Sequence, residues 1–152
     1  MLNHDMRAIE IKTKALKLTK RPIPTPAPHQ VLIQVAAAGV NRPDIMQRQG
    51  LYPAPQGTTD IPGLEISGTI IATGTAVSHL QPGDVICALV TGGGYAEYCL
   101  STASQCLPIP EGLSLIQAAA IPEAFILSGV IYLTEPSYYH TKHYWYMEAL
   151  VE

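Results

Sequence analysis

The stretch at residues 63–74 reads Gly-Leu-Glu-Ile-Ser-Gly-Thr-Ile-Ile-Ala-Thr-Gly, and Gly-Asp-Val follows it at residues 83–85. Glycines punctuate a run of β-branched residues, a pattern that predicts a strand over residues 64–72. Glu65, the acidic residue inside this run, would need hydrogen-bond partners if it were buried. Asp84 lies in a Gly-Asp turn, for which we expect a structural role.

A second informative stretch lies upstream at residues 39–53, which read Gly-Val-Asn-Arg-Pro-Asp-Ile-Met-Gln-Arg-Gln-Gly-Leu-Tyr-Pro. Its proline at position 43 and its glycine at position 50 predict a short helical turn between them. We interpret Arg42, Asp44 and Arg48 as an ion-pair cluster that holds this loop, an arrangement that contributes little free energy if it is exposed.

In this order, the two stretches resemble the N-terminal GroES-like domain of the medium-chain dehydrogenase/reductase superfamily, from about Met6 to Phe125. Zinc-binding members of that superfamily place a ligand Cys where Asn41 stands and a ligand His where Leu64 stands. A catalytic zinc needs three protein ligands around an open position. The chain therefore resembles the zinc-independent quinone oxidoreductases, whose full-length members use NADPH to reduce a quinone-type small molecule.

The resemblance implies a mainly β fold, a GroES-like partly open β-barrel with short helices that lacks the Rossmann domain. Alternating apolar and polar residues, with glycine and proline between the segments, predict further strands at residues 6–11, 16–18, 31–38, 85–89 and 95–100. We interpret Gly92-Gly93-Gly94 as a tight turn between strands. Ser114 is expected to cap an Ala-rich helical turn that Pro122 interrupts.

Composition narrows the class of protein. Residues are 47% hydrophobic and only 14% charged, which argues for a globular chain. The net charge of -3 provides no basic face, so we expect neither nucleic acid nor membrane as partner, and a cytoplasmic location. Cys87, Cys99 and Cys106 form no Cys-x-x-Cys pair and are expected to be ordinary core or strand thiols.

The residues after the predicted domain differ in character. Five of the eight tyrosines lie between Tyr132 and Tyr146, and no glycine fingerprint of a nucleotide site follows. The codons from Leu127 onward can also be read in a shifted frame, in which the third base of each codon is joined to the first two bases of the next. With synonymous codons chosen freely, this frame permits the amino-acid sequence VWSNLFDRAKLLSHQTLLVHGGTSGI. This sequence resembles the family's interdomain helix, first strand and Gly-rich turn. We therefore interpret residues 6–125 as the substrate-side domain and residues 126–152 as a poorly structured, out-of-frame tail that truncates the protein.

Two residues are the candidates for the site. In the family, polar residues at the positions of Tyr52 and Asn41 line the cleft between substrate and nicotinamide. Tyr52 would position the substrate, because a tyrosine hydroxyl donates to an oxygen on which negative charge develops. Asn41 would line the cofactor side of the cleft. The competing interpretations are an aromatic residue in a Pro-rich loop for Tyr52 and a turn-stabilising residue for Asn41.

Two classes of function remain open. The first is a zinc-independent NADPH:quinone oxidoreductase, of which this chain is the substrate-side domain, inactive alone and binding no cofactor. The second is a free-standing GroES-like barrel that acts as a binding or interaction module. A chain without its Rossmann partner would leave an apolar interdomain face exposed, which would promote self-association.

We predict that the purified chain carries no stoichiometric zinc. Asn41 and Leu64 replace ligands, and His140 and His143 in the tail lack a third donor nearby. Elemental analysis after dialysis is the measurement. One tightly held zinc per chain would contradict the prediction.

Overall fold

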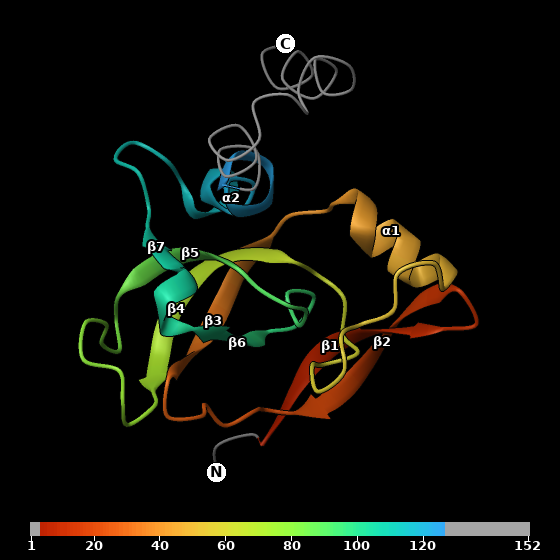
Figure 1. Ribbon diagram of the computed structural model, residues 1–152, viewed down its shortest axis with the longest axis horizontal. Coiled ribbons are helices and arrows are strands. Elements are labelled where there is room, and N and C mark those ends of the chain that lie inside the picture. The colour runs from red at the N-terminus through yellow and green to blue at the C-terminus, as the bar shows by residue number, and fades with distance from the viewer. Residues whose placement is uncertain (1–3, 127–152) are drawn as a thin grey trace.

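The computed structural model describes residues 4–126, so that the predicted tail beyond Ile126 lies outside the described residues. Figure 1 follows the elements from red to blue in chain order. They are β1 (Asp5–Lys12), β2 (Ala15–Pro22), β3 (Gln30–Ala38), α1 (Arg42–Gln49), β4 (Glu65–Thr73), β5 (Val85–Leu89), β6 (Tyr98–Thr102), the 3-10 helix η1 (Ala103–Gln105), β7 (Cys106–Pro108), α2 (Leu115–Ala118) and the π-helical turn η2 (Pro122–Ile126).

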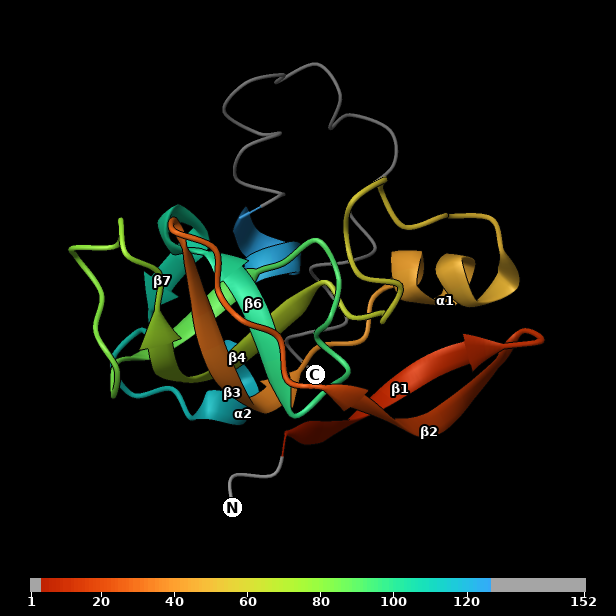
Figure 2. The same cartoon turned by 90° about the horizontal axis from the view of Figure 1, so that it is seen from below.

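The first two strands form an antiparallel hairpin that projects to one side of the molecule (Figure 2). Its turn residues Thr13 and Lys14 have positive φ angles of 50° and 62°, and a two-residue turn of this kind matches the twist of the strands. Both predicted strands are confirmed, and β2 runs on to Pro22. Proline is tolerated there because it ends an edge strand.

The main sheet has five antiparallel strands in the order β6-β3-β4-β5-β7. The predicted strands at residues 31–38, 64–72 and 85–89 are confirmed within one residue at each end, whereas the strand predicted at 95–100 begins later, at Tyr98. The short strand β7 was not predicted, because three residues ending in proline carry no strand period. The core side chains of the sheet are Val31, Ile33, Ile66, Ile70, Ile86, Ala88, Val90, Cys99 and Ala103.

The sheet is curved, because only a short segment of chain connects β6 at one edge to β7 at the other. These two strands lie at opposite edges of the sheet, yet β6 ends at Thr102 and β7 begins at Cys106. Four Cα steps reach at most about 14 Å, whereas the outer strands of a flat five-stranded sheet lie about 19 Å apart. The edges therefore approach each other, and they share no backbone pairing among the described residues. This is the predicted mainly β, partly open barrel.

The predicted tight turn at Gly92-Gly93-Gly94 is wrong, because β5 and β6 are not neighbours in the sheet. The glycine segment instead runs along residues 61–63. Gly93 N–H donates to the Ile61 carbonyl at 2.8 Å, and Gly94 N–H donates to the Gly63 carbonyl at 3.1 Å. A Cβ on Gly63 would lie 2.7 Å from the backbone nitrogen of Tyr95. These glycines therefore permit close contact between two loops that are distant in sequence.

The helices are short, and α1 and α2 lie above the strands in the view of Figure 1. The predicted cap at Ser114 is confirmed, because its Oγ accepts from the N–H of Gln117 at 3.3 Å. The helix α2 ends at Ala118, before Pro122, and Pro122 begins η2 rather than interrupting α2. Proline fits there because the first turn of a helix lacks partners for its N–H groups. No helix within residues 4–126 is long and apolar enough to cross a membrane.

We predict that Gly68→Ala destabilises the barrel by about 1–3 kcal/mol, the usual cost of overpacking. Gly68 lies in the central strand β4, and a Cβ there would lie 2.2 Å from the backbone oxygen of Gln34 on β3. Its φ lies outside the left-handed region, so the cost is steric. Urea denaturation followed by circular dichroism measures the loss. Ile71→Ala, at a position 40% exposed on the same strand, is the control and should cost less. Equal midpoints for the two variants would contradict the prediction.

Candidate functional site

The segment after β3 is organised by Asn41 and the helix that it starts. Asn41 is the N-cap residue of α1, and its backbone N–H donates to Asp44 Oδ2 at 2.8 Å. This contact satisfies one of the groups that a helix start leaves without a partner. At the other end Gly50 adopts a left-handed conformation with φ 81° and donates to the Gln47 carbonyl at 3.0 Å. The predicted helical turn is thus confirmed, with proline inside its start and glycine just past its end.

The predicted ion-pair cluster of Arg42, Asp44 and Arg48 is wrong. Among the described residues, none of the ion pairs involves these three side chains, and both arginines are exposed. Asp44 is instead 4% exposed and accepts three hydrogen bonds. Besides the N–H of Asn41, it accepts from the Gly63 N–H at 3.0 Å and from the Tyr95 hydroxyl at 3.0 Å. A buried carboxylate is stabilised by direct donors, which the solvated arginines do not provide.

The hydroxyl of Tyr95 is held as a donor to Asp44. Burial, with the adjacent Asp44 carboxylate as a further cause, raises the pKa of Tyr95. The hydroxyl therefore keeps its proton over the physiological range and remains available to Asp44. Through this contact Asp44 joins α1 to the loop before β4 and to the segment before β6.

Glu65 is the second buried carboxylate, and its side chain is only 3% exposed. It has the hydrogen-bond partners that we expected a buried glutamate at this position to need. Its Oε1 accepts from the Asn41 side-chain amide at 2.7 Å, and its Oε2 accepts from the Glu123 backbone N–H at 2.9 Å. The carboxyl group lies against Gly39, where an added Cβ would meet Glu65 Oε1. A single side chain thereby connects β4, the loop after β3 and the start of η2.

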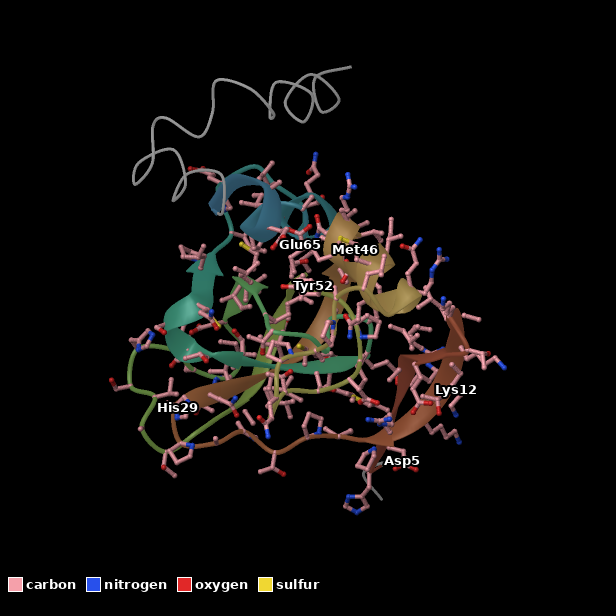
Figure 3. All side chains as sticks on the ribbon, turned by 45° about the vertical axis from the view of Figure 1, so that its right-hand side comes forward. Asp5, Lys12, His29, Met46, Tyr52 and Glu65 are labelled. Atoms are coloured by element: carbon pink, nitrogen blue, oxygen red, sulfur yellow. The ribbon has the colours of Figure 1, made fainter. Side chains whose placement is uncertain are left out.

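A cavity of about 220 Å³ opens beside these carboxylates. In Figure 3 the labelled Tyr52 and Glu65 lie at the end of the molecule that carries α1 and the C-terminal helical turns, away from Asp5 and Lys12 on the hairpin. The wall is mostly apolar, with a few polar groups, the usual composition of a small-molecule site. Its lining residues are Pro43 and Gln47 of α1, Tyr52, Ala54 and Pro55 of the next loop, and Leu64, Leu89, Val90, Thr91 and Glu123.

The two predicted site residues lie differently with respect to this cavity. Tyr52 lines it and is 42% exposed, so its hydroxyl is accessible to a ligand. Asn41 does not line it, and its side-chain amide is engaged by Glu65. The hydrogen bonds of Asn41 fit the competing interpretation, a residue that stabilises the chain after a strand. Contact of Tyr52 with substrate and of Asn41 with cofactor both stay predictions.

Glu123 is a cavity residue that the sequence did not reveal. Burial raises the pKa of its carboxyl group, and the carboxylates of Glu65 and Asp44 raise it further. The only sequence signal was a glutamate directly after Pro122 in an apolar segment, 58 positions from Glu65. Spacing along the chain does not show that these two acids meet.

Other polar candidates have structural roles. Asp84 Oδ2 accepts from the Gln81 N–H at 2.8 Å within the predicted turn. The three cysteines are free, and burial raises the pKa of each thiol, that of Cys99 to about 12. Thiols of this kind are poor nucleophiles. Within residues 4–126 no group of three or more His, Cys, Asp or Glu side chains could hold a metal ion, and the tail histidines lie outside that range.

Comparison with known families decides the identity of the fold. The family described as "Alcohol dehydrogenase GroES-like domain" matches residues 27–111, more than half of the chain. The chain belongs to this family. Its members are built on a mainly β domain, and the described residues of this chain show that domain with few short helices.

Among the relatives of this GroES-like domain, quinone oxidoreductase of Rattus norvegicus is 40% identical over 100 residues, which cover 65% of this chain and 30% of the rat protein. The crystal structure of human synaptic vesicle membrane protein VAT-1 homolog-like protein matches with a TM-score of 0.76 and 32% identity, over 84% of this chain and 42% of that chain. The quinone oxidoreductase of Coxiella burnetii matches with a TM-score of 0.74 and 27% identity, over 85% and 44%. The chain thus spans about 30% of the length of the curated relatives.

We predict that Glu65→Ala destabilises the domain by about 3 kcal/mol, because it leaves the Asn41 amide and the Glu123 N–H without their acceptor. Urea denaturation measures the free energy of unfolding. Glu111→Ala removes an exposed carboxylate and should change stability by less than about 0.5 kcal/mol. A Glu65→Ala variant as stable as the Glu111→Ala control would show that these bonds do not hold the site together.

Proposed function

We propose that this chain is the substrate-side domain of a zinc-independent quinone oxidoreductase, in which NADPH supplies the hydride that reduces a quinone. The observation that carries the proposal is the cavity itself. Its wall includes Leu64, where zinc-binding members of the superfamily carry a ligand, and Tyr52 brings a hydroxyl to the same space. An apolar wall with a hydroxyl donor suits an uncharged ring compound with carbonyl oxygens.

The Asn41 position supports the same class of enzyme. Its side-chain amide donates to Glu65 at 2.7 Å, so it acts as a fixed donor within the protein, and an amide is a poor substitute for a thiolate zinc ligand. In the proposed reaction the domain contributes position and hydrogen-bond donors to the quinone. Several relatives, among them the rat protein, bear the name quinone oxidoreductase.

The described residues do not fit the NADPH cofactor. Within residues 4–126 the sheet pairings are antiparallel, and none of the strands leads through a Gly-rich turn into a helix that would bind the pyrophosphate. We therefore assign this domain the quinone side of the reaction, derive no step through the cofactor, and expect the chain alone to be inactive. Its own residues bind the quinone ring, shield it from water and donate to its oxygen.

The cofactor side is encoded, in our proposal, in the shifted frame after Phe125. That frame permits an interdomain helix, an apolar strand and Gly-Gly-Thr-Ser-Gly-Ile, the features that the described domain lacks. The domain proposed to end near residue 125 and the out-of-frame segment after it would then be two parts of one interrupted enzyme.

We predict that adding one base near the codons for Phe125 to Leu127 extends the product into an enzyme that oxidises NADPH with duroquinone. The physical reason is that the extension supplies the nucleotide site that the described residues lack. The unchanged chain is the control, and it should neither oxidise NADPH nor bind it saturably at micromolar concentration.

Each failure has its own meaning. An early stop in the restored frame would contradict the frameshift proposal. A folded, extended protein without quinone-dependent oxidation would contradict the assignment as a quinone oxidoreductase. Saturable NADPH binding by the unchanged chain would contradict the division of roles between the two parts.

A further inference from the structure

Glu123 occupies an unusual position, at the point where the barrel ends and the cavity begins. Its backbone N–H is fixed by Glu65 Oε2 at 2.9 Å, and its side chain lines the cavity with Tyr52 and Leu64. No hydrogen bond or ion pair of the described residues engages its carboxyl group. The backbone of Glu123 is therefore anchored, while the carboxyl group is available to a ligand.

The charged surroundings of this carboxyl group are negative on each side. Burial raises its pKa, and the carboxylates of Glu65 on β4 and Asp44 on α1 raise it further. Among residues 4–126, the only other titratable group in the lining is the Tyr52 hydroxyl, and no lysine, arginine or histidine of that range lines the cavity. A carboxyl group without a cation nearby and next to two carboxylates keeps its proton more readily than an exposed glutamate does.

A protonated carboxylic acid has a hydrogen-bond donor that the carboxylate lacks. With Glu123 protonated, the cavity would present two hydroxyl donors, from Tyr52 and Glu123, beside apolar lining residues such as Leu64, Leu89 and Val90. This arrangement matches a flat, apolar ligand with an acceptor oxygen. It opposes an anionic ligand, which would contact Glu123, would lie in the negative field of Glu65 and Asp44, and would find no cation among the described lining residues.

We propose that Glu123 binds in its neutral form, as a hydrogen-bond donor to a carbonyl oxygen of an uncharged ligand in this cavity, and that the cavity excludes anionic ligands. The inference rests on the proposed function and narrows its substrate class to uncharged quinones. Glu123 is thereby a residue for substrate binding and selectivity beside Tyr52.

The test uses the full chain and duroquinone, whose four methyl groups block addition of the free cysteine thiols. Equilibrium dialysis gives Kd from about pH 4 to about pH 9, a range that spans ordinary and raised glutamate pKa values. For the wild-type chain, binding should be tight at low pH and weaken roughly threefold to tenfold as the pH rises through the raised pKa of Glu123, since the donor is lost on ionisation.

Two variants separate the donor from the general shape of the cavity. Glu123→Gln keeps an N–H donor and nearly the same volume, so it should bind duroquinone with no pH dependence from this position. Glu123→Ala removes the donor and should bind roughly threefold to tenfold more weakly than the wild type at low pH. Glu111→Gln, at an exposed position, is the matched control and should keep the wild-type profile. Thermal melting establishes that each variant is folded.

A trimethylquinone that carries a carboxylate side chain tests the exclusion of anions, and it should bind at least about tenfold more weakly than duroquinone to the wild type. Unchanged pH dependence in folded Glu123→Gln, or equal binding of the two quinones, would overturn the inference and leave the proposed function standing. Absence of duroquinone binding to the wild type at every pH would overturn the proposed function as well.

Discussion

The arrangement of this domain depends on one buried carboxylate, that of Glu65. A buried charge without partners costs several kcal/mol, and here its partners come from two distant segments, the Asn41 amide and the Glu123 N–H. The carboxyl group can lie there only because position 39 is glycine, since a Cβ would meet its oxygen. The loop after β3 and the helical turns after β7 are therefore positioned by the same side chain on the central strand.

Asp44 extends this connection to the segments before β4 and β6. It accepts from backbone and side-chain donors at Asn41, Gly63 and Tyr95, which lie far apart in the sequence. The two acids thus fix segments that carry lining residues, since Pro43 precedes Asp44 and Leu64 precedes Glu65, while the cavity wall itself is formed by apolar residues such as Leu64 and Leu89. Satisfied buried polar groups of this kind specify a unique arrangement, because any shift of the loops leaves a donor or acceptor without a partner.

This construction has a chemical consequence for the proposed function. The carboxylates that organise the loops also generate a negative field at Glu123, and no lysine, arginine or histidine among the described lining residues offsets it. That field favours neutral ligands and, together with burial, raises the pKa of the Glu123 carboxyl group. The same two residues, Glu65 and Asp44, therefore hold the loops against the barrel and produce the selectivity proposed for the site.

The sequence by itself determined the strands β1 to β5, the short helix that ends at Gly50, the cap at Ser114 and the family, because these follow from local periodicity, turn chemistry and motif order. It did not determine which neighbours the charged residues find. Asp44 was expected to pair with the arginines on its own helix, and the tertiary fold pairs it instead with Gly63 and Tyr95. Three further features were decided only by the tertiary structure. They are the path of Gly92-Gly93-Gly94 along residues 61–63, the approach of the two sheet edges that η1 connects, and the position of Glu123 in the cavity wall. The physical reason is that burial and hydrogen bonding act between segments distant in the chain, and local patterns carry no information on which distant segments meet.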